Sequence, residues 1–277
     1  METGPGLVCI GDNVVDLYRD RGVFYPGGNA LNVAVLARRA GLARSAYIGI
    51  VGSDREGAHV RASMLAEGIS DALVREAVGP NGKAQVTHDA SGDRVFVGTN
   101  HGGIRRRVML RMDEDDLALV AALGHVHSSC FSYLEPELPR LRAVARELSF
   151  DFSTGRDPAY LAAVCPHVST AFLSGADLDE AGLSALIRQV QGHGTTTVCI
   201  TLGERGAVWA RGGTVLRQGI VPTAVVDTMG AGDGFIAGYL AASIAGAEPP
   251  VALQRAAAHA AATCGWHGAW GHGMADA

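Results

Sequence analysis

The 277-residue sequence lacks several features that would assign it to a common protein class. Its five cysteines are scattered singly, without a Cys-x-x-Cys pair, which argues against a disulfide framework or a zinc site and favours buried thiols in a reducing compartment. The chain has no apolar run long enough to cross a bilayer, and it does not start with a basic segment followed by an apolar one. We therefore expect a cytoplasmic protein with no membrane partner.

Two nucleotide-binding signatures are also missing. The chain contains neither the Gly-x-Gly-x-x-Gly fingerprint of dinucleotide-binding dehydrogenases nor the Gly-x-x-x-x-Gly-Lys loop of P-loop kinases. A formal net charge of -5 argues against a general nucleic-acid binder, which needs a basic face to neutralise phosphates. We expect small molecules as partners and no nucleic acid.

The most informative stretch is residues 225–235, Val-Val-Asp-Thr-Met-Gly-Ala-Gly-Asp-Gly-Phe. Val225 and Val226 predict the end of a buried strand, and the apolar residues after Asp233 predict a helix. The glycine-rich turn at 230–232 would gather backbone N–H groups at the helix start, where the helix dipole favours an anion. Asp233 could then take a proton from a hydroxyl group, which suits phosphoryl transfer to an alcohol. The alternative is a turn that uses glycine for geometry and aspartate for capping.

Polar residues follow the first predicted strand, residues 7–11. Ligands of an open parallel sheet bind beyond the carboxyl ends of its strands, so Asp12 and Asp16 are candidates for accepting hydrogen bonds from sugar hydroxyls. For both residues the alternative is a solvated loop carboxylate, which is about equally plausible for Asp12 and less plausible for Asp16.

A second glycine-rich segment, residues 26–32, opens a helix predicted over residues 33–40. The Gly-Gly pair at its start lets backbone amides approach a ligand, and Asn29 and Asn32 can both donate and accept hydrogen bonds. An asparagine cap on the helix is the alternative, and capping alone would account for Asn29.

Strand and helix signals alternate along most of the chain. We therefore expect residues 1–277 to form one α/β domain, a doubly wound, mainly parallel sheet with helices on both faces. Two segments, about 14–25 and 83–100, read instead as hairpins without helices of their own, the second turning at residues 89–93. Together they could form a small β-lid that excludes water, and its outer strand edge could pair two copies into a homodimer.

Three groups of residues allow two interpretations each. Arg105-Arg106-Arg107 could meet a phosphate, but a short exposed charge cluster is the better interpretation. His125 and His127 share one face of a strand and could bind a metal, yet without a third ligand nearby we favour packing. Residues 201–206, Thr-Leu-Gly-Glu-Arg-Gly, form either a nucleotide loop or part of a structural hairpin.

Four further residues have no assigned role. Asp151 and Arg156 follow a predicted strand and could lie at the rim of the site, although a capped loop is at least as plausible. His267 and Trp270 could border a nucleotide or simply pack.

These motifs together resemble the signatures of the PfkB carbohydrate kinases, also called the ribokinase-like family. The resemblance covers nearly the whole chain and implies a ribokinase-like fold with a β-lid. On the Asp-Thr-Met-Gly-Ala-Gly-Asp motif, it implies that Asp233 is the catalytic base and that Gly230, Ala231 and Gly232 form the anion hole. Asp227, at the start of the motif, would lie in the region of a cation.

The resemblance also implies a sugar grip. Gly-Gly-x-x-x-Asn corresponds to Gly27, Gly28 and Asn32, which would hold the sugar through the glycine backbone and the asparagine side chain. The Gly-Asp-Asn-Val-Val-Asp motif adds Asp16, whose carboxylate would bind the substrate's hydroxyls, and Asp12 stays a candidate beside it.

For the nucleotide, Thr-x-Gly-x-x-Gly implies that Thr201, Gly203 and Gly206 lie beside the phosphates of ATP. Mg²⁺ is expected with those phosphates, and a monovalent cation such as K⁺ is a further candidate. Many family members carry Asn-x-x-Glu where this chain has Ser174 and Asp177, so the metal ligands stay open.

Within the family, the likeness is greatest to the fructoselysine 6-kinases. It rests on Gly-Asp-Asn-x-Val-Asp, on Asp-Phe-Ser at 151–153, on Ile-Ala-Gly at 236–238 and on His-Gly-Ala-Trp at 267–270. It implies transfer of the γ-phosphoryl group of ATP to the 6-hydroxyl of a fructosamine such as fructoselysine. Another sugar kinase of the family, for ribose, fructose or 2-keto-3-deoxygluconate, is the first alternative. A non-catalytic nucleotide or sugar sensor is the second, and Asp233 argues against it because binding alone needs no base.

Overall fold

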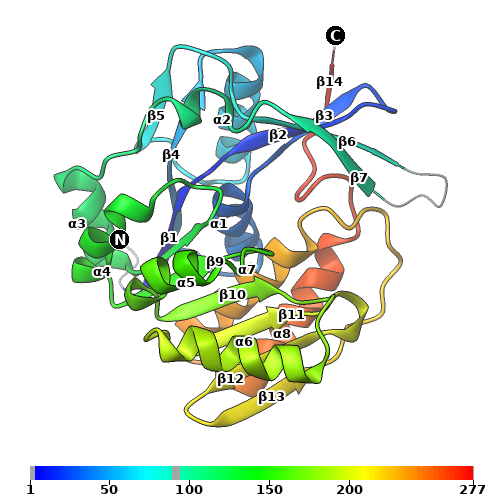
Figure 1. Cartoon of the computed structure of the whole chain (residues 1–277). Helices are drawn as coiled ribbons and strands as arrows, with labels where there is room; N and C mark the ends of the chain where they lie inside the picture. The colour runs from blue at the N-terminus through cyan, green and yellow to red at the C-terminus, as the bar shows by residue number, and fades with distance from the viewer. Residues whose placement is uncertain (1–3, 89–93, 277) are drawn as a thin grey trace.

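A sheet of nine strands forms the centre of the described part of the molecule (Figure 1). The structure is a computed structural model that describes residues 4–88 and 94–276. The strand order is β13-β12-β11-β10-β9-β8-β1-β4-β5, parallel from β11 to β5 and antiparallel at β12 and β13. The strands are β1 Gly6–Gly11, β4 Ser45–Gly52, β5 Val74–Ala77, β8 Gly124–Ser129, β9 Glu147–Asp151, β10 Thr170–Ser174, β11 Thr197–Thr201, β12 Ala207–Arg211 and β13 Thr214–Gln218.

Helices cover both faces of this sheet, so the predicted doubly wound architecture is confirmed. In β1, Leu7 and Cys9 pack into a core with α1, α2, α7 and α8, whereas Val8 and Ile10 pack into a core with α3, α4, α5 and α6. Figure 1 shows α6 in front of the sheet and α7 and α8 behind it. The helices are α1 Asn29–Arg39, α2 Arg55–Ala66, α3 Glu114–Leu123, α4 Leu138–Val144, α5 Pro158–Val164, α6 Glu180–Gly192, α7 Ala231–Ile244 and α8 Pro249–Thr263.

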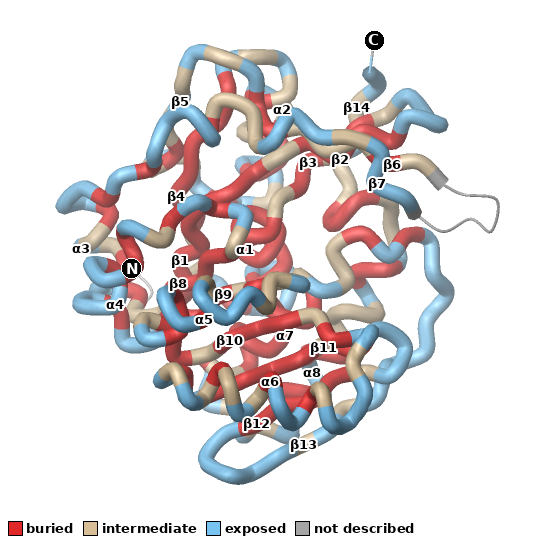
Figure 2. The backbone as a smooth tube through the Cα atoms, in the orientation of Figure 1, coloured by how far each residue is buried: buried red, intermediate tan, exposed pale blue. Residues whose placement is uncertain are grey.

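Burial follows from the two helical layers. Strand β1 is buried along its whole length, whereas the edge strand β13 is largely exposed (Figure 2). Strands covered on both faces read as continuous apolar runs, which is why the sequence of β1 shows no alternation.

A second sheet of five strands lies beside the first, in the order β14-β3-β2-β6-β7. Its strands are β2 Val14–Tyr18, β3 Val23–Gly27, β6 Lys83–His88, β7 Arg94–Thr99 and β14 Met274–Ala275. Four of them fall in or next to the two segments that were expected to form the lid, while β14 was not expected. The predicted turn at residues 89–93 lies outside the described residues. We call this sheet the lid sheet.

Helices α7 and α8 pack with their backbones unusually close. A Cβ on Gly238 of α7 would lie 3.0 Å from the Cα of Ala256 and 2.9 Å from the Cβ of His259, and a Cβ on Gly234 would collide with Thr263. Because only glycine leaves this space, α7 and α8 form one tightly joined pair.

The carboxyl ends of the parallel strands bring polar residues together at one edge of the large sheet. Asp12 follows β1, Ser129 ends β8, Asp151 ends β9 and Thr201 ends β11. Helix α1 begins at this edge, at Asn29 and not at Val33 as expected, because Gly28 takes the N-cap position with a φ of 100°.

Candidate active site

The first turn of α7 carries Asp233. Gly230 is the N-cap residue with a φ of 75°, a left-handed conformation suited to glycine, and a Cβ there would lie 2.5 Å from the Cβ of Ala269. The carboxylate of Asp233 accepts hydrogen bonds at both oxygens. Asn29 Nδ2 donates to Oδ1 at 2.8 Å, and Asn32 Nδ2 donates to Oδ2 at 2.7 Å. The predicted base and the predicted sugar ligand Asn32 are therefore direct neighbours.

Asn29 connects two carboxylates and does not cap the helix. The N-cap of α1 is Gly28, and no side chain caps this helix, so the capping interpretation of Asn29 is wrong. Besides Asp233, Asn29 Nδ2 donates to Asp151 Oδ2 at 2.9 Å. Its Oδ1 lies 3.1 Å from Nε2 of His127. Sequence reasoning missed this role because the partners are far apart in the chain.

The contacts of Asn29 determine the protonation of His127. Both N–H groups of Asn29 point to carboxylates, so its Oδ1 must accept, and His127 must carry its proton on Nε2. His127 Nδ1 then faces the hydroxyl of Ser149 at 2.9 Å, and the carbonyl oxygen of Val126 is a second acceptor 3.0 Å from the same hydroxyl. Burial lowers the pKa of His127 to about 3, which keeps the ring neutral. The described residues contain no cluster of three His, Cys, Asp or Glu side chains that could hold a metal ion.

Asp151 shares the donor Asn29 with Asp233. Burial raises the pKa of Asp151 to about 7; the Ser153 N–H opposes this increase, whereas the charges of Asp233 and Asp12 add to it. The carboxyl group of Asp151 thus titrates near neutrality, and Asn29 links it to the predicted base through two hydrogen bonds. A group of this kind indicates a functional site.

Trp270 fixes the orientation of Asn32. Its indole Nε1 donates to Asn32 Oδ1 at 2.8 Å, which leaves the amide N–H groups of Asn32 facing Asp233. The backbone carbonyl of Trp270 accepts from Arg39 at 2.8 Å. Trp270 therefore packs, which is one of its two interpretations, and it also contacts the site through Asn32.

Asp12 is held by two serines that the sequence did not single out. Its Oδ1 accepts from Ser129 Oγ at 2.9 Å and Ser132 Oγ at 2.8 Å, and the N–H of Ala30 donates to the same oxygen at 3.2 Å. Asp12 is buried. These bonds place its carboxylate between the ends of β1 and β8 and the start of α1, so Asp12 is not a solvated loop residue.

The glycine pair of the predicted sugar grip lies against this group. A Cβ on Gly28 would lie 2.6 Å from the Cα of Asn13, and a Cβ on Gly27 would collide with the carboxylate of Asp16. Asp16 is buried on β2 of the lid sheet. The structure therefore brings together Asp12, Asp16, Gly27, Gly28 and Asn32.

Asp227 joins three parts of the chain. Its Oδ1 accepts from the N–H of Met229 at 2.9 Å, and its Oδ2 accepts from the N–H of Gly268 at 3.0 Å and from the hydroxyl of Tyr18. Asp227 is buried. It thus fixes the turn before α7 against the lid sheet, and its location near a cation stays a prediction.

A cavity of about 580 Å³ lies on the other side of the α7 turn. The three predicted nucleotide residues line it together with Ala231 and Gly232 of the predicted anion hole, so the structure brings these two motifs to one site. The Ala-rich helix α8 forms a further wall through Ala257, Ala260 and Ala261. The predicted nucleotide residues are Thr201, Gly203 and Gly206.

The expected strand end at Val225 and Val226 is wrong. Strand β13 ends at Gln218, and both valines lie in an exposed loop, with 61% and 48% of their surface accessible. Val225 lines the 580 Å³ cavity, where its apolar side chain is suited to a ligand and not to a sheet. Two β-branched residues before a glycine turn gave a misleading strand signal.

The sequence of this chain is similar to those of known proteins. Residues 7–149 and 158–271 match the family model described as pfkB family carbohydrate kinase. The chain belongs to the pfkB family. It is therefore a carbohydrate kinase, as its motifs predicted. The chain is 47% identical to the fructosamine kinase FrlD of Bacillus subtilis (strain 168), over 96% of this chain and 93% of that protein. It is 36% identical to fructoselysine 6-kinase of Escherichia coli (strain K12), over 95% and 99%.

Solved structures confirm the ribokinase-like fold of this pfkB kinase. Ribokinase of Arabidopsis thaliana, complexed with ribose and ATP, superposes with a TM-score of 0.82 at 21% identity, over 96% of this chain and 94% of that chain. Aminoimidazole riboside kinase of Salmonella enterica gives 0.76 at 20% identity, over 96% and 95%. ATP and Mg²⁺, expected from the sequence, fit this family, and K⁺ stays a prediction.

The residues in place of Asn-x-x-Glu in this pfkB kinase are not arranged as a metal site. Arg156 forms a bidentate pair with the carboxylate of Asp177 at 2.6 and 2.9 Å and donates to the carbonyl oxygen of Ser174. The Arg156 guanidinium lowers the pKa of Asp177 to about 2. The carboxylate of Asp177 is thus already paired with a guanidinium group, and we assign no Mg²⁺ ligand to Ser174 or Asp177.

Two other residues of the pfkB kinase differ from expectation. His267 lies 2.8 Å from a guanidinium nitrogen of Arg21, next to the lid sheet, and does not line the 580 Å³ cavity. Within the Arg105-Arg106-Arg107 run, Arg106 and Arg107 are exposed as expected, but Arg105 is buried, which contradicts its interpretation as part of an exposed cluster.

Proposed function

We propose that this kinase transfers the γ-phosphoryl group of ATP to the 6-hydroxyl of a fructosamine such as fructoselysine. The observation that carries the proposal is the position of Asp233. One turn of α7 presents Gly232 to the 580 Å³ cavity and holds Asp233 against Asn29 and Asn32, beside Asp12 and Asp16. A carboxylate between a nucleotide-sized cavity and a group of buried polar side chains suits a base in phosphoryl transfer to a sugar.

In the proposed reaction, Asp233 accepts the proton of the sugar hydroxyl. The hydroxyl oxygen forms a bond to the γ-phosphorus as the bond from that phosphorus to the bridging oxygen breaks, and ADP leaves. The N–H groups of residues 230–232 lie at the positive end of α7 and stabilise negative charge on the phosphoryl oxygens. Asn29 and Asn32 hold the two oxygens of Asp233, so its orientation is fixed before substrate binds.

The residues that line the cavity determine how ATP and its metal ions would fit. The cavity beside the α7 turn has the size and the glycine-lined wall that a nucleotide's phosphates need. The described residues hold no group of three candidate metal ligands, so Mg²⁺ would enter with the phosphates, whose charge it neutralises. A K⁺ ion near Asp227 remains part of the proposal.

The fructosamine substrate is supported by relatives at 47% and 36% identity that carry this activity in their names and align along nearly their whole length. A coupled ADP-release assay with Mg-ATP should give a higher kcat/KM for fructoselysine than for fructose, ribose or 2-keto-3-deoxygluconate. Preference for a plain sugar would discard the fructosamine assignment but keep the kinase. No turnover with any of the four would favour a non-catalytic sensor.

A homodimer through the lid sheet is a further part of the proposal. The sheet order ends at β7, and three apolar side chains of this outer strand are between 41% and 61% exposed, namely Val95, Phe96 and Val97. An apolar outer strand is suited to pairing with a second copy. Light scattering of the wild type and of Val97→Lys tests it, since a wild-type monomer would contradict the dimer.

The described residues form no helix that could span a membrane. A cytoplasmic location also remains a proposal.

A further inference from the structure

Arg105 is a buried cation that has no hydrogen-bond partner among the described residues. It lies on the short 3-10 helix η1, Gly103–Arg106, with 3% of its surface exposed. None of its three guanidinium nitrogens makes a hydrogen bond to the described residues. Arg61, Arg75 and Arg156 also have one nitrogen each without a hydrogen bond, but all three form ion pairs through their other nitrogens. Arg105 therefore differs from every other arginine with a buried, unpaired atom in the described chain.

The position of η1 places Arg105 beside the predicted sugar site. Helix η1 packs against β4, whose Tyr47 hydroxyl accepts a hydrogen bond from Asn13 at 2.9 Å, next to Asp12. The turn before η1 also lies close to Asn13, because a Cβ on Gly82 would lie 2.9 Å from the carbonyl oxygen of Asn13 and 3.4 Å from the Cα of Gly102. The Oδ1 of Asn13 is itself buried without a partner.

The electrostatic surroundings of Arg105 agree with this position. Burial lowers its pKa, and the carboxylates of Asp12 and Glu135 are among the groups within range that oppose this effect, together with the ionisable hydroxyls of Tyr47 and Tyr133. Asp12 and Glu135 thus attract the guanidinium, but neither makes a hydrogen bond with it. None of these four residues belongs to the α7 turn, where the phosphoryl group would be transferred. A group that pairs with the Arg105 guanidinium would therefore lie near the sugar and not near the phosphates.

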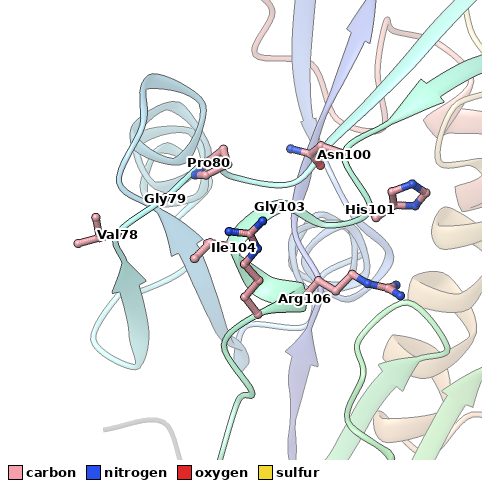
Figure 3. A pocket seen from close by; sticks show the side chains of 9 residues that line it. Val78, Gly79, Pro80, Asn100, His101, Gly103, Ile104 and Arg106 are labelled. Carbon is pink, nitrogen blue, oxygen red and sulfur yellow. The ribbon is translucent and has the colours of Figure 1, made fainter.

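A cavity lies next to Arg105 in the chain, on its neighbours Arg106 and Arg107, although Arg105 itself is not among the residues that line it. Arg106 and Arg107 line a cavity of about 680 Å³, together with His101 and Ile104 (Figure 3). Arg106 donates to the hydroxyl of Tyr133 at 3.2 Å. Tyr133 follows Ser132, which holds Asp12. The cavity thus opens beside the sugar site, has a positive wall and could hold the part of a substrate that extends beyond the sugar.

On the basis of the proposed fructosamine kinase function, we infer that Arg105 binds a carboxylate on the amine part of the substrate. A guanidinium group suits this role because it can bind both oxygens of a carboxylate with two parallel hydrogen bonds. An unpaired charge is costly to bury, and a ligand carboxylate would offset this cost when substrate binds. A fructosamine formed from an amino acid carries such a carboxylate, and plain fructose does not. Arg105 would therefore determine specificity for glycated amino acids.

Two substrates of equal size test the inference. Fructosylglycine has the carboxylate, and fructosylglycinamide has a neutral amide in its place. The wild type should prefer fructosylglycine in kcat/KM by about 10- to 100-fold, the range of a charged hydrogen bond. In Arg105→Gln this preference should fall to nearly 1 through loss of fructosylglycine turnover, with fructosylglycinamide little changed. Arg105→Lys should recover part of the preference because it keeps the charge. Arg188→Gln, on the exposed side of α6, is the matched control and should keep it.

A structural role for Arg105 predicts other results. Since Arg105→Gln removes an unpaired buried charge, its melting temperature without substrate should equal or exceed that of the wild type. A lower melting temperature with equal loss for both substrates would overturn the inference, as would an unchanged preference in Arg105→Gln.

Failure of the proposed function can be distinguished from failure of this inference. If the wild type phosphorylates both fructosamines equally well, the fructosamine function stands and the carboxylate site is overturned. If it phosphorylates fructose and neither fructosamine, both are overturned. If it turns over 2-keto-3-deoxygluconate and Arg105→Gln abolishes that reaction, the carboxylate belongs to a sugar acid, and our assignment to the amine part is overturned.

Discussion

Trp270 and Asn32 stand 238 residues apart in the chain and are joined by a hydrogen bond of 2.8 Å from the indole Nε1 to the amide Oδ1. Because an amide has one oxygen and one NH₂ group, this bond determines that the NH₂ group faces Asp233. Trp270 therefore acts on the predicted base through Asn32 and is a positioning residue.

Trp270→Phe should lower kcat about 10-fold and leave the KM for ATP nearly unchanged, because Asn32 loses the bond that orients it. A cavity in the core should also lower stability by about 1–3 kcal/mol. Trp209→Phe is the control, since it removes an indole bond to the Tyr239 hydroxyl outside the site. Initial-rate kinetics and thermal melts separate the two effects, and an equal fall in kcat for both variants would contradict the positioning role.

Asp233→Asn should lower kcat by roughly a hundredfold or more, because an amide cannot accept the proton of the sugar hydroxyl. The fold should persist with a small loss of stability, since one of the two asparagine donors loses its acceptor. Calorimetry should show that much of the ATP binding remains. Asp115→Asn on α3 controls for the loss of an exposed charge. Wild-type activity in Asp233→Asn would remove this residue from its role as base.

The two glycines of the predicted anion hole should respond differently to alanine. At Gly230 the left-handed backbone and the contact with Ala269 leave no room for a Cβ, so Gly230→Ala should destabilise the fold by about 1–3 kcal/mol. At Gly232 a Cβ meets no atom within 4 Å, but it would project where Gly232 lines the nucleotide cavity. Gly232→Ala should keep the melting temperature and raise the KM for ATP several-fold. The reverse pattern would show that the turn does not hold phosphate.

Asp151→Asn should remove one pH dependence of stability. Burial raises the pKa of Asp151 to about 7 from 3.8, so between about pH 4 and pH 7 the folded protein holds a proton that the unfolded chain has released. The free energy of unfolding of the wild type should therefore fall as the pH rises through this window. Relative to Asp151→Asn, this loss should be about 2–3 kcal/mol between pH 5 and pH 8. Urea unfolding of both proteins at pH 5 and pH 8 measures it, and a constant difference between them would disprove the raised pKa.

The parts of the candidate site whose location in the fold the sequence predicted depend on short stretches of chain. The turn at 230–232 and Asp233 form one uninterrupted motif, and helix geometry alone places the carboxylate in the first turn beside the amides. Likewise, Thr201 and the glycines after it follow a strand directly, so their location at the carboxyl edge of the sheet follows from the strand order.

The parts that were missed depend on contacts between distant segments. Asn29 meets Asp151 across 122 residues and His127 across 98, and no local pattern encodes these pairs. Ser129 and Ser132 are ordinary residues until β8 brings them to Asp12. The burial of Arg105 could not be read from a run of three arginines, because such runs are usually solvated.

The close packing of α7 on α8 has a consequence for how the 580 Å³ cavity can change shape. The turn that starts α7 forms the side of the 580 Å³ cavity where the proposed function places the phosphates, and α8 forms a further wall. Since Gly234 and Gly238 bring the two backbones almost into contact, these walls cannot separate without unpacking the helices. The exposed loop around Val225 is the wall of this cavity that can move without disturbing the helix pair. Any adjustment of the cavity to its ligand would therefore occur in this loop, while the surface formed by α7 and α8 keeps its shape.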